Sequence, residues 1–332
     1  MATVKIENLG EEFSWGSRVS GVNLKNLKDA ELREELAQLL KDRGLIVFQD
    51  LEPSAELQVE ISTVFGPLKD HPTKSTPRAE GELPPGVIEI DYGGTHAAEQ
   101  TDHGLVEVNG KKLISFLPWH FDHTYNDELN YAGVLRPVRI APEMGRTGYA
   151  DGIEIWERLP ADLKARIEDK SVLYTLDVRL TQMPFGRYFK TFGDLPHQAG
   201  NVEESKTFPR AIHPMVWTRE DGQKVAHYCG FSAVGLENHE DEEGNALFEE
   251  ALQEMYKVIT PYWHAWKLTD MLIWDNSRVL HSVEGCDPKY PRCVHRTTIR
   301  GDYGLGRFEH GKKIGEVMRE GVAPLALPEG AE

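Results

Sequence analysis

The 332-residue chain has little cysteine and little positive charge. Cysteine occurs three times, at Cys229, Cys286 and Cys293. An odd number without paired spacing is typical of a reduced compartment rather than of a disulfide-rich secreted fold. Lysine and arginine number 37 against 54 aspartates and glutamates, which gives a formal net charge of −17. Because no broad cationic surface can neutralise phosphates, we expect neither nucleic acid nor a membrane among the partners.

Long apolar runs and glycine-rich nucleotide motifs are also missing. The longest apolar runs, such as residues 44–48, have the length of a strand and are too short to span a bilayer. Residues 1–7 lack the basic and apolar regions of a signal peptide, so we expect a cytoplasmic protein. No GxGxxG or GxxxxGK[ST] motif stands between a strand and a helix, which disfavours a nucleotide-binding α/β fold.

Apolar spacing and turn residues predict an α+β chain that is mainly β, with flanking helices. We expect helices from Asp29 to about residue 43, over about 53–65, from Pro160 to about Asp169, and over about 245–258. The predicted strands are short and separated by Gly, Pro and Asp: Leu45–Phe48, Ala132–Leu135, Thr147–Ala150, Ser171–Val178, His213–Trp217, Val225–Tyr228, Met271–Trp274 and Val294–Ile299. Many short strands of fairly even spacing indicate an antiparallel sandwich or jelly roll.

The chain is expected to form a single domain over residues 1–320, followed by a loose tail at 321–332. Residues 67–118 are rich in glycine, proline and charge and have weak periodicity. Loops of this length in a compact domain are commonly lids or binding loops, so we expect a lid or insert here.

Two histidines and one aspartate form the most informative pattern. His120 and Asp122 stand at i and i+2 in the segment WHFDH, so on an extended chain both side chains point to one face. His281 follows the apolar segment ending in Trp274-Asp275-Asn276. Together the three would provide two imidazoles and a carboxylate. That set leaves three positions of an octahedral iron open, and the absence of thiolates in CxxC spacing disfavours a structural zinc site.

Two arginines form a second pattern near the C-terminal end of the predicted core. Arg292 and Arg296 are four residues apart on a predicted strand, so both project to one face, which Val294 shares. A buried arginine needs an anion, and its planar fork suits a carboxylate. Two alternatives remain open on the residues alone. A cupin-like metal-dependent hydrolase or isomerase would need the metal ligands without the arginines, and a small-anion-binding protein would need the arginines without all three ligands.

These segments resemble the taurine dioxygenase/2,4-dichlorophenoxyacetate dioxygenase (TauD/TfdA) family of Fe(II)/2-oxoglutarate enzymes. The resemblance covers roughly residues 15–305. It rests on Ser20–Leu24, Gly44–Asp50, Phe65–Leu68, the WHxD and WDN…H segments, His213–Val216 and the closing RxxxR. The spacing agrees as well. Thr147 stands 27 positions after His120, and Arg292 and Arg296 stand 11 and 15 positions after His281.

The resemblance implies a double-stranded β-helix core of the jelly-roll, clavaminate-synthase-like type and a set of site residues. His120, Asp122 and His281 would hold Fe(II). Thr147 and Arg292 would bind the distal carboxylate of 2-oxoglutarate, and Arg296 would lie beside its metal-chelating end. In sulfonate-using members the residue matching Arg296 also contacts the substrate anion. His71 stands where those members place a substrate-anion histidine.

The resemblance also implies a reaction, in which O2 converts 2-oxoglutarate to succinate and CO2 while a C–H bond of a small organic substrate is hydroxylated. Desaturation and ring formation use the same residues and stay open. Phe116 and Trp217 stand where taurine-using members carry polar residues, so we expect both to form apolar walls of the substrate cavity. The expected substrate therefore has an anionic or polar head and an apolar body. Association into a homo-oligomer is left open. The remaining histidines at 103, 123, 197, 227, 239 and 264 are expected to be surface or loop residues.

Overall fold

The computed structural model describes residues 3–69, 83–92, 103–194, 202–203, 205, 208–301 and 303–311. Much of the predicted insert at 67–118, with His71, and the predicted tail at 321–332 lie outside the described residues. Among the described residues, no helix combines the length and apolarity needed to cross a bilayer.

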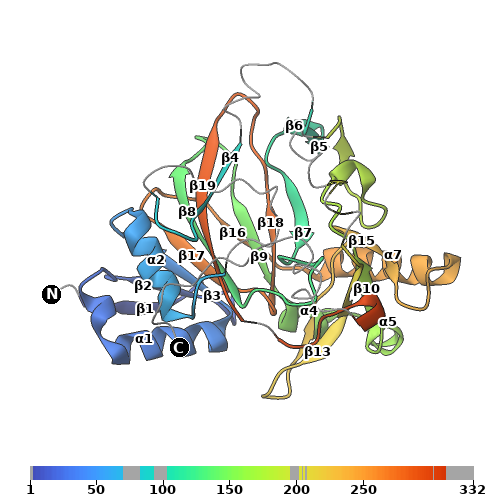
Figure 1. Ribbon diagram of the computed structural model, residues 1–332, viewed down its shortest axis with the longest axis horizontal. Helices are drawn as coiled ribbons and strands as arrows, with labels where there is room; N and C mark the ends of the chain where they lie inside the picture. The colour runs from blue at the N-terminus through green and yellow to red at the C-terminus, as the bar shows by residue number, and fades with distance from the viewer. Residues whose placement is uncertain are drawn as a thin grey trace.

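Two facing β-sheets form the centre of the molecule (Figure 1). The larger sheet has the strand order β1-β2-β3-β17-β8-β19-β4. Its strands are β1 (Lys5–Asn8), β2 (Ser17–Ser20), β3 (Leu45–Gln49), β17 (Met271–Asp275), β8 (Ala132–Arg139), β19 (Arg292–Ile299) and β4 (Ile88–Tyr92). The second sheet has the order β16-β9-β18-β7, with β16 (Tyr262–His264), β9 (Thr147–Asp151), β18 (Val279–Val283) and β7 (Leu117–His120). The predicted antiparallel jelly roll is therefore confirmed, although β2 and β3 pair in parallel.

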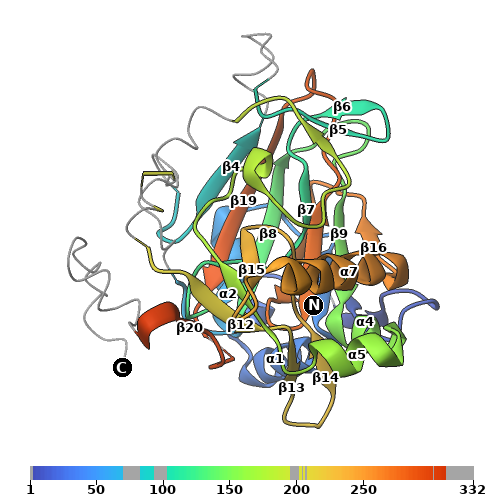
Figure 2. The ribbon, with the colours of Figure 1, turned by 90° about the vertical axis from the view of Figure 1, so that its right-hand side faces the viewer.

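Three smaller sheets flank this core. One has the order β15-β10-β12-β20 and contains β15 (Ala233–Leu236), β10 (Ser171–Tyr174), β12 (Ala211–Pro214) and β20 (Arg307–Phe308). Another joins β11 (Lys190–Thr191), β5 (Val106–Val108) and β6 (Lys111–Leu113). The last is the hairpin of β13 (Val216–Thr218) and β14 (Lys224–Ala226). Figure 2 shows β5 and β6 at the end of the sandwich opposite β13 and β14.

Two N-terminal helices cover the outer face of the larger sheet (Figure 1). In α1 (Ala30–Arg43), the Asp29 carboxylate accepts a hydrogen bond from the backbone of Glu31, and Gly44 ends the helix with φ +74°. In α2 (Ala55–Val64), Ser54 is the N-cap. Apolar side chains of both helices pack on alternate residues of β3 and β17, whereas the residues between them face the second sheet. Central strands buried on both faces explain the uninterrupted apolar segment at 45–48.

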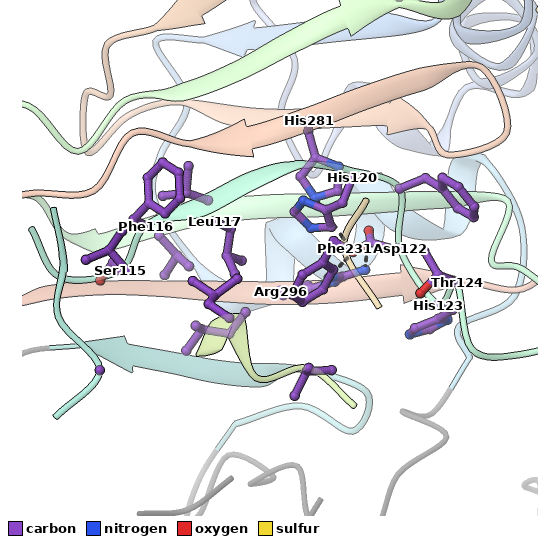
Figure 3. A pocket seen from close by; sticks show the side chains of 18 of the residues that line it. Ser115, Phe116, Leu117, His120, Asp122, His123, Thr124, Phe231, His281 and Arg296 are labelled. Carbon is purple, nitrogen blue, oxygen red and sulfur yellow. Dashed lines mark hydrogen bonds and ion pairs between the residues drawn. The ribbon is translucent and has the colours of Figure 1, made fainter. Parts of the chain in front are cut away.

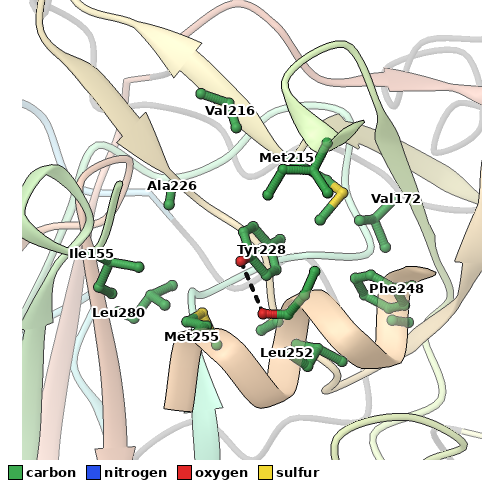
Figure 4. Close-up of a cluster of buried hydrophobic side chains, with 14 of the residues drawn as sticks. Ile155, Val172, Met215, Val216, Ala226, Tyr228, Phe248, Leu252, Met255 and Leu280 are labelled. Atoms are coloured by element: carbon green, nitrogen blue, oxygen red, sulfur yellow. Dashed lines mark hydrogen bonds between the residues drawn. The ribbon is translucent and has the colours of Figure 1, made fainter. Parts of the chain in front are cut away.

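Three further helices cover the outer side of the second sheet. They are α4 (Gly152–Arg158), α5 (Ala161–Ile167) and α7 (Glu242–Val258). Phe248, Leu252 and Met255 of α7 contact a buried cluster with Ile155 of α4 and Leu280 of β18 (Figure 4). The Tyr228 hydroxyl donates to the Ala251 carbonyl of α7, which satisfies a polar atom inside this cluster.

A buried ion pair fixes the junction of the two sheets. Arg278, in the turn before β18, donates to both carboxylate oxygens of Asp151 at 2.8 and 3.0 Å and to the Asp42 carbonyl at 2.9 Å. Both ion-pair side chains are buried. Because the turn precedes His281 by three residues, this pair fixes the start of the strand that carries it.

Candidate active site

A cavity of about 310 Å³ lies between the two sheets at the end of β7 (Figure 3). His120, Asp122 and His281 form part of its wall, and Arg292 and Arg296 of β19 line it as well. Apolar side chains make up much of the rest: Phe116, Leu117, Leu135, Leu176, Val178, Leu180, Phe231 and Val283. The cavity therefore joins a small charged cluster to an apolar space.

The two predicted histidines and the aspartate come together from two neighbouring strands. His120, on β7, is directly opposite His281, on β18, in the strand register, and their ring centroids are 4.1 Å apart. Asp122 follows β7, and its Oδ1 lies 3.6 Å from His281 Nε2. One ligand atom from each of the three residues lies within 4.8 Å of the others, and all three residues are buried. This donor set fits a divalent transition metal.

Hydrogen bonding and burial prepare these side chains as ligands. His120 Nδ1 lies 2.8 Å from the Pro118 carbonyl, so it carries the ring proton and leaves the Nε2 lone pair for a metal. Burial lowers the pKa of both His120 and His281, which favours neutral imidazoles. Burial acts to raise the pKa of Asp122, but the Arg296 guanidinium together with His281 and His120 outweighs it and holds this pKa well below the ordinary value. The carboxylate is therefore ionised.

Arg296 binds the aspartate of this cluster directly. Its Nη1 and Nη2 donate to the two Asp122 carboxylate oxygens at 3.0 and 2.6 Å, as the dashed lines in Figure 3 show. Its guanidinium also lies 5.8 Å from the Trp274 ring. Two parallel hydrogen bonds orient the carboxylate plane, which a single ammonium could not do. Among the described residues, the buried Arg296 Nε has no hydrogen-bond partner.

Asn276 is a residue that the sequence reasoning did not assign. Its buried side chain accepts from the Asp122 backbone N–H at 2.8 Å and donates to the Asp122 carbonyl at 3.1 Å. It also lies within hydrogen-bond distance of Asn130. His227 contacts the Asn276 carbonyl at 2.8 Å. The position of Asn276 in the WDN segment, five residues before His281, was the available sequence signal.

The two residues predicted to hold the distal carboxylate of 2-oxoglutarate are both buried. Thr147, on β9, is fully buried, and its hydroxyl accepts from Trp266 Nε1 at 3.0 Å. Arg292, on β19, lines both the main cavity and a second cavity of about 270 Å³ whose wall includes Trp266 and Gly145. Arg292 and Arg296 thus stand on one face of β19, as the four-residue spacing predicted.

Of the residues predicted to contact the substrate, one lines the main cavity, one lies outside the described residues and one is directed elsewhere. Phe116 lines the main cavity and packs on Phe189, with ring centroids 5.1 Å apart. His71 lies outside the described residues. Trp217 is not among the described residues that line this cavity, because its indole is directed at the Ser277 carbonyl, to which it donates at 2.8 Å. The expectation that Trp217 forms a cavity wall is therefore wrong.

Three of the histidines expected at the surface or in loops are buried: His123 and His227 do lie outside helices and strands, whereas His264 lies in β16. His123, with φ +59°, lines the cavity beside Asp122. His227 stacks on Phe121, with ring centroids 3.9 Å apart. His264 lies between the Tyr262 hydroxyl at 2.9 Å and the Asp270 carboxylate at 3.1 Å. The cysteines are free and buried, as expected of small apolar residues.

A second group of potential ligands, Glu89, Cys293 and His295, lies on the other face of β19. Arg136 Nη2 lies 2.6 Å from His295 Nδ1, and an arginine can only donate. Burial lowers the pKa of His295, so the ring is neutral and its proton is on Nε2, directed at Glu89 at 3.2 Å. This ring has no lone pair left for a metal, and the group is a hydrogen-bonded link between β4 and β19.

A jelly roll that carries two histidines and a carboxylate beside arginines is the architecture of a non-haem metal oxygenase that uses an anionic cosubstrate. Comparison with known proteins agrees. Residues 5–298 match the family model described as taurine catabolism dioxygenase TauD, TfdA family. The chain belongs to this family of Fe(II)- and 2-oxoglutarate-dependent dioxygenases, which are oxidoreductases that use O2. Membership decides against the cupin-like hydrolase or isomerase and the anion-binding protein.

Individual relatives are distant but extend over most of the chain. The (S)-phenoxypropionate/alpha-ketoglutarate-dioxygenase of Sphingobium herbicidovorans is 25% identical over 292 residues, 88% of this chain and 93% of the relative. The alpha-ketoglutarate-dependent 2,4-dichlorophenoxyacetate dioxygenase of Cupriavidus pinatubonensis is 24% identical, covering 83% and 94%. The crystal structure of AAD-2 in complex with Mn(II) and N-oxalylglycine matches with a TM-score of 0.66 at 20% identity, covering 91% of this chain and 99% of that chain.

Proposed function

We propose that His120, Asp122 and His281 hold the Fe(II) of this dioxygenase. The observation that carries the proposal is the convergence of their ligand atoms within 4.8 Å at the wall of a mostly apolar cavity. When bound, Fe(II) with 2-oxoglutarate supplies the activation of O2. The protein's part is to keep the imidazoles neutral, the carboxylate ionised and oriented by Arg296, and the cavity apolar.

The metal assignment is tested with His120→Ala, Asp122→Ala and His281→Ala. Each variant should lose stoichiometric Mn(II) binding and succinate formation while keeping the circular dichroism spectrum of the parent. In the parent, anaerobic addition of Fe(II) and 2-oxoglutarate should produce a visible charge-transfer band. Asp122→Gly leaves the two histidines in place and opens one metal position. A variant that retains parental metal affinity would remove its residue from the site.

Thr147 and Arg292 are proposed to bind the distal carboxylate of 2-oxoglutarate, and Arg296 to lie beside its metal-chelating end. Support comes from the burial of Thr147 and Arg292, and from the second cavity, which is lined by Arg292 and by Trp266, the hydrogen-bond partner of Thr147. The partly buried guanidinium of Arg296 adds a donor, its Nε, next to the ligand cluster.

The prime substrate is proposed to be a small molecule with an anionic or polar head and an apolar, aryl-sized body. Support for the body comes from Phe116 and Leu117, which lie to one side of the ligand cluster in Figure 3, and from Phe231, whose ring centroid is 5.3 Å from that of His120. Support for the head comes from Arg296 and from His123 beside Asp122, and His71 is proposed to contribute as well. Two relatives are named for phenoxypropionate and 2,4-dichlorophenoxyacetate, which both join a carboxylate to an aromatic ring.

A screen for succinate release tests this substrate class. Aryloxyalkanoates, aliphatic sulfonates and alkyl sulfates are compared at equal concentration, each with a neutral amide or alcohol analogue. The proposal expects an aryl acid to exceed both its neutral analogue and taurine by at least tenfold in kcat/KM. Preference for the neutral analogue would refute the anionic head without affecting the metal assignment. We also propose a cytoplasmic location, which is supported by three free, buried cysteines.

A further inference from the structure

The hydroxyl of Thr147 is constrained on one side by an indole. Thr147 lies in the middle of the second sheet, where β9 pairs with both β16 and β18, so its backbone is engaged in the sheet and the hydroxyl is the group that remains. Trp266 Nε1 lies 3.0 Å from Thr147 Oγ1. Among the described residues this is the one hydrogen bond of the Thr147 side chain.

This contact determines whether the Thr147 hydroxyl donates or accepts each of its hydrogen bonds. An indole nitrogen is a donor only, whereas a hydroxyl has one proton to donate and two lone pairs. Thr147 Oγ1 must therefore accept from Trp266, and its own proton must be donated elsewhere. The residue is fully buried, and a buried donor without an acceptor is costly, so the proton is suited to an acceptor on a bound molecule.

Trp266 is itself held in place by a buried polar network. Its ring meets the His264 ring edge-on, with centroids 4.8 Å apart. His264 is held by the Tyr262 hydroxyl and by Asp270, whose carboxylate also accepts from the Lys267 backbone. Trp266 and Arg292 line the same second cavity, so the indole is located beside the arginine proposed for the distal carboxylate.

We propose that Trp266 is a positioning residue for 2-oxoglutarate: by donating to Thr147 Oγ1 it turns the threonine hydroxyl into a donor directed at the distal carboxylate beside Arg292. This inference rests on the proposed clamp of Thr147 and Arg292. It assigns to Trp266 a selectivity for 2-oxo dicarboxylates, since a 2-oxo acid without the second carboxylate gives the hydroxyl proton no ionic acceptor.

The test measures binding rather than turnover. The dissociation constants of 2-oxoglutarate and of 2-oxopentanoate, which has a methyl group in place of the distal carboxylate, are determined by calorimetry on the Mn(II)-loaded protein. Trp266→Phe should raise the dissociation constant of 2-oxoglutarate about 3- to 10-fold, as expected for the loss of one hydrogen bond. The dissociation constant of 2-oxopentanoate should change by less than twofold. In a Thr147→Val background, Trp266→Phe should have no further effect. Thr147→Ser should keep the parental response to Trp266→Phe.

Trp263→Phe is the matched control. Trp263 lies on β16, and its ring packs on Gly148, the residue after Thr147. Because side chains alternate along a strand, this is the face of the sheet opposite the Thr147 hydroxyl. Trp263→Phe should leave the affinity for 2-oxoglutarate within twofold of the parent. If Trp266→Phe fails to fold, replacing Trp266 with 3-benzothienylalanine exchanges the N–H for sulfur at nearly constant volume.

The outcomes separate this inference from the clamp itself. If Arg292→Ala weakens 2-oxoglutarate but neither Trp266 variant does, the role of Trp266 is refuted and the clamp stands. Equal weakening of both ligands, or a further loss in the Thr147→Val background, would mean that the indole acts through packing, and this also overturns the proposal. If Arg292→Ala has no effect on 2-oxoglutarate, the clamp is misassigned and the inference fails with it.

Discussion

Removal of the Asn276 side chain should damage the candidate metal site although Asn276 is not among the proposed ligands. The side-chain amide bonds both the N–H and the carbonyl of Asp122, at 2.8 and 3.1 Å, and is itself fully buried. Asp122 lies two residues beyond the end of β7, where none of the described strands pairs with its backbone. The Asn276 amide therefore makes the two backbone hydrogen bonds with Asp122 that a neighbouring strand would otherwise make.

The expected loss of stability follows from the backbone groups of Asp122 that lose their partner. Asn276→Ala leaves one buried N–H and one buried carbonyl of Asp122 without this partner, and each unsatisfied group costs about 1–3 kcal/mol. We expect the free energy of unfolding to fall by about 2–5 kcal/mol. A residue that orients a metal ligand typically changes metal affinity about 10- to 100-fold, and we expect a loss of that size for Mn(II).

Asn276→Asp gives a sharper test at constant shape. A carboxylate oxygen in place of the amide nitrogen would face the carbonyls of Asp122 and Asn130, which lie 3.1 and 3.3 Å away. It would lose two donated bonds and add repulsion, so this variant should be at least as damaged as Asn276→Ala. Asn130→Ala is the matched control, because it removes a buried amide that bonds Asn276 but not Asp122.

Urea unfolding followed by circular dichroism measures stability, and competition with a fluorescent chelator measures Mn(II) affinity. The reasoning requires the two effects to appear together in the Asn276 variants, with Asn130→Ala affecting metal affinity by less than threefold. If Asn276→Asp binds Mn(II) like the parent, the amide does not orient Asp122 and this account is wrong.

Three further outcomes are expected. In calorimetry, the binding free energy of 2-oxoglutarate should fall by about 2–5 kcal/mol in Arg292→Ala and by about 1–2 kcal/mol in Thr147→Val. Unchanged affinity in both variants would show that these two residues do not bind the distal carboxylate. Arg278→Ala should lower the free energy of unfolding in urea by about 3–5 kcal/mol by leaving its buried aspartate partner unpaired, and a loss under 1 kcal/mol would contradict this. Burial lowers the pKa of His213 to about 4 and of His227 to about 3. Both lie below the ordinary 6.5, so the unfolded chain binds protons first as the pH falls. Stability should therefore decline from about pH 6.5 downward, by up to about 1.4 kcal/mol per pH unit for each histidine, and His213→Gln should reduce the slope.

Local features of the fold were predictable because their causes are local. The start of α1 at Asp29 and its end at Gly44 depend on a capping carboxylate and on a backbone angle that glycine adopts freely. The helix α4 was not predicted, because it follows β9 without a turn, with Asp151 ending the strand and capping the helix. The predicted strand His213–Trp217 is two strands, β12 and β13, in different sheets. Periodicity indicates that a segment is extended but not which strand it pairs with.

The buried histidines show where reasoning from single residues fails. His227 and His264 were expected at the surface or in loops, and both are buried. The partner of His227 is a backbone carbonyl 49 positions away, whereas His264 is held by Tyr262 and Asp270, two and six positions away. A polar residue is buried when the fold brings it a partner, and neither a backbone carbonyl nor these irregular spacings leave a periodic signal. The convergence of His120, Asp122 and His281 could be predicted because two imidazoles and a carboxylate are a combination typical of metal ligands.

The two arginines of β19 have the same side chain but different surroundings, and therefore different roles. Both project from the same face of one strand, yet Arg296 forms two hydrogen bonds with the Asp122 carboxylate, whereas Arg292, four residues earlier on the strand, lines two cavities. Because Arg296 compensates the charge of Asp122, the aspartate can stay ionised in a buried site before any metal arrives. This contact uses two of the five N–H groups of Arg296, and the buried Nε is among those that it leaves over. Since the Asp122 carboxylate already offsets the charge of Arg296, an anionic head gains less from this arginine than from an unpaired one, and so we expect Arg292 and the rest of the cavity wall to contribute to the selection of the prime substrate.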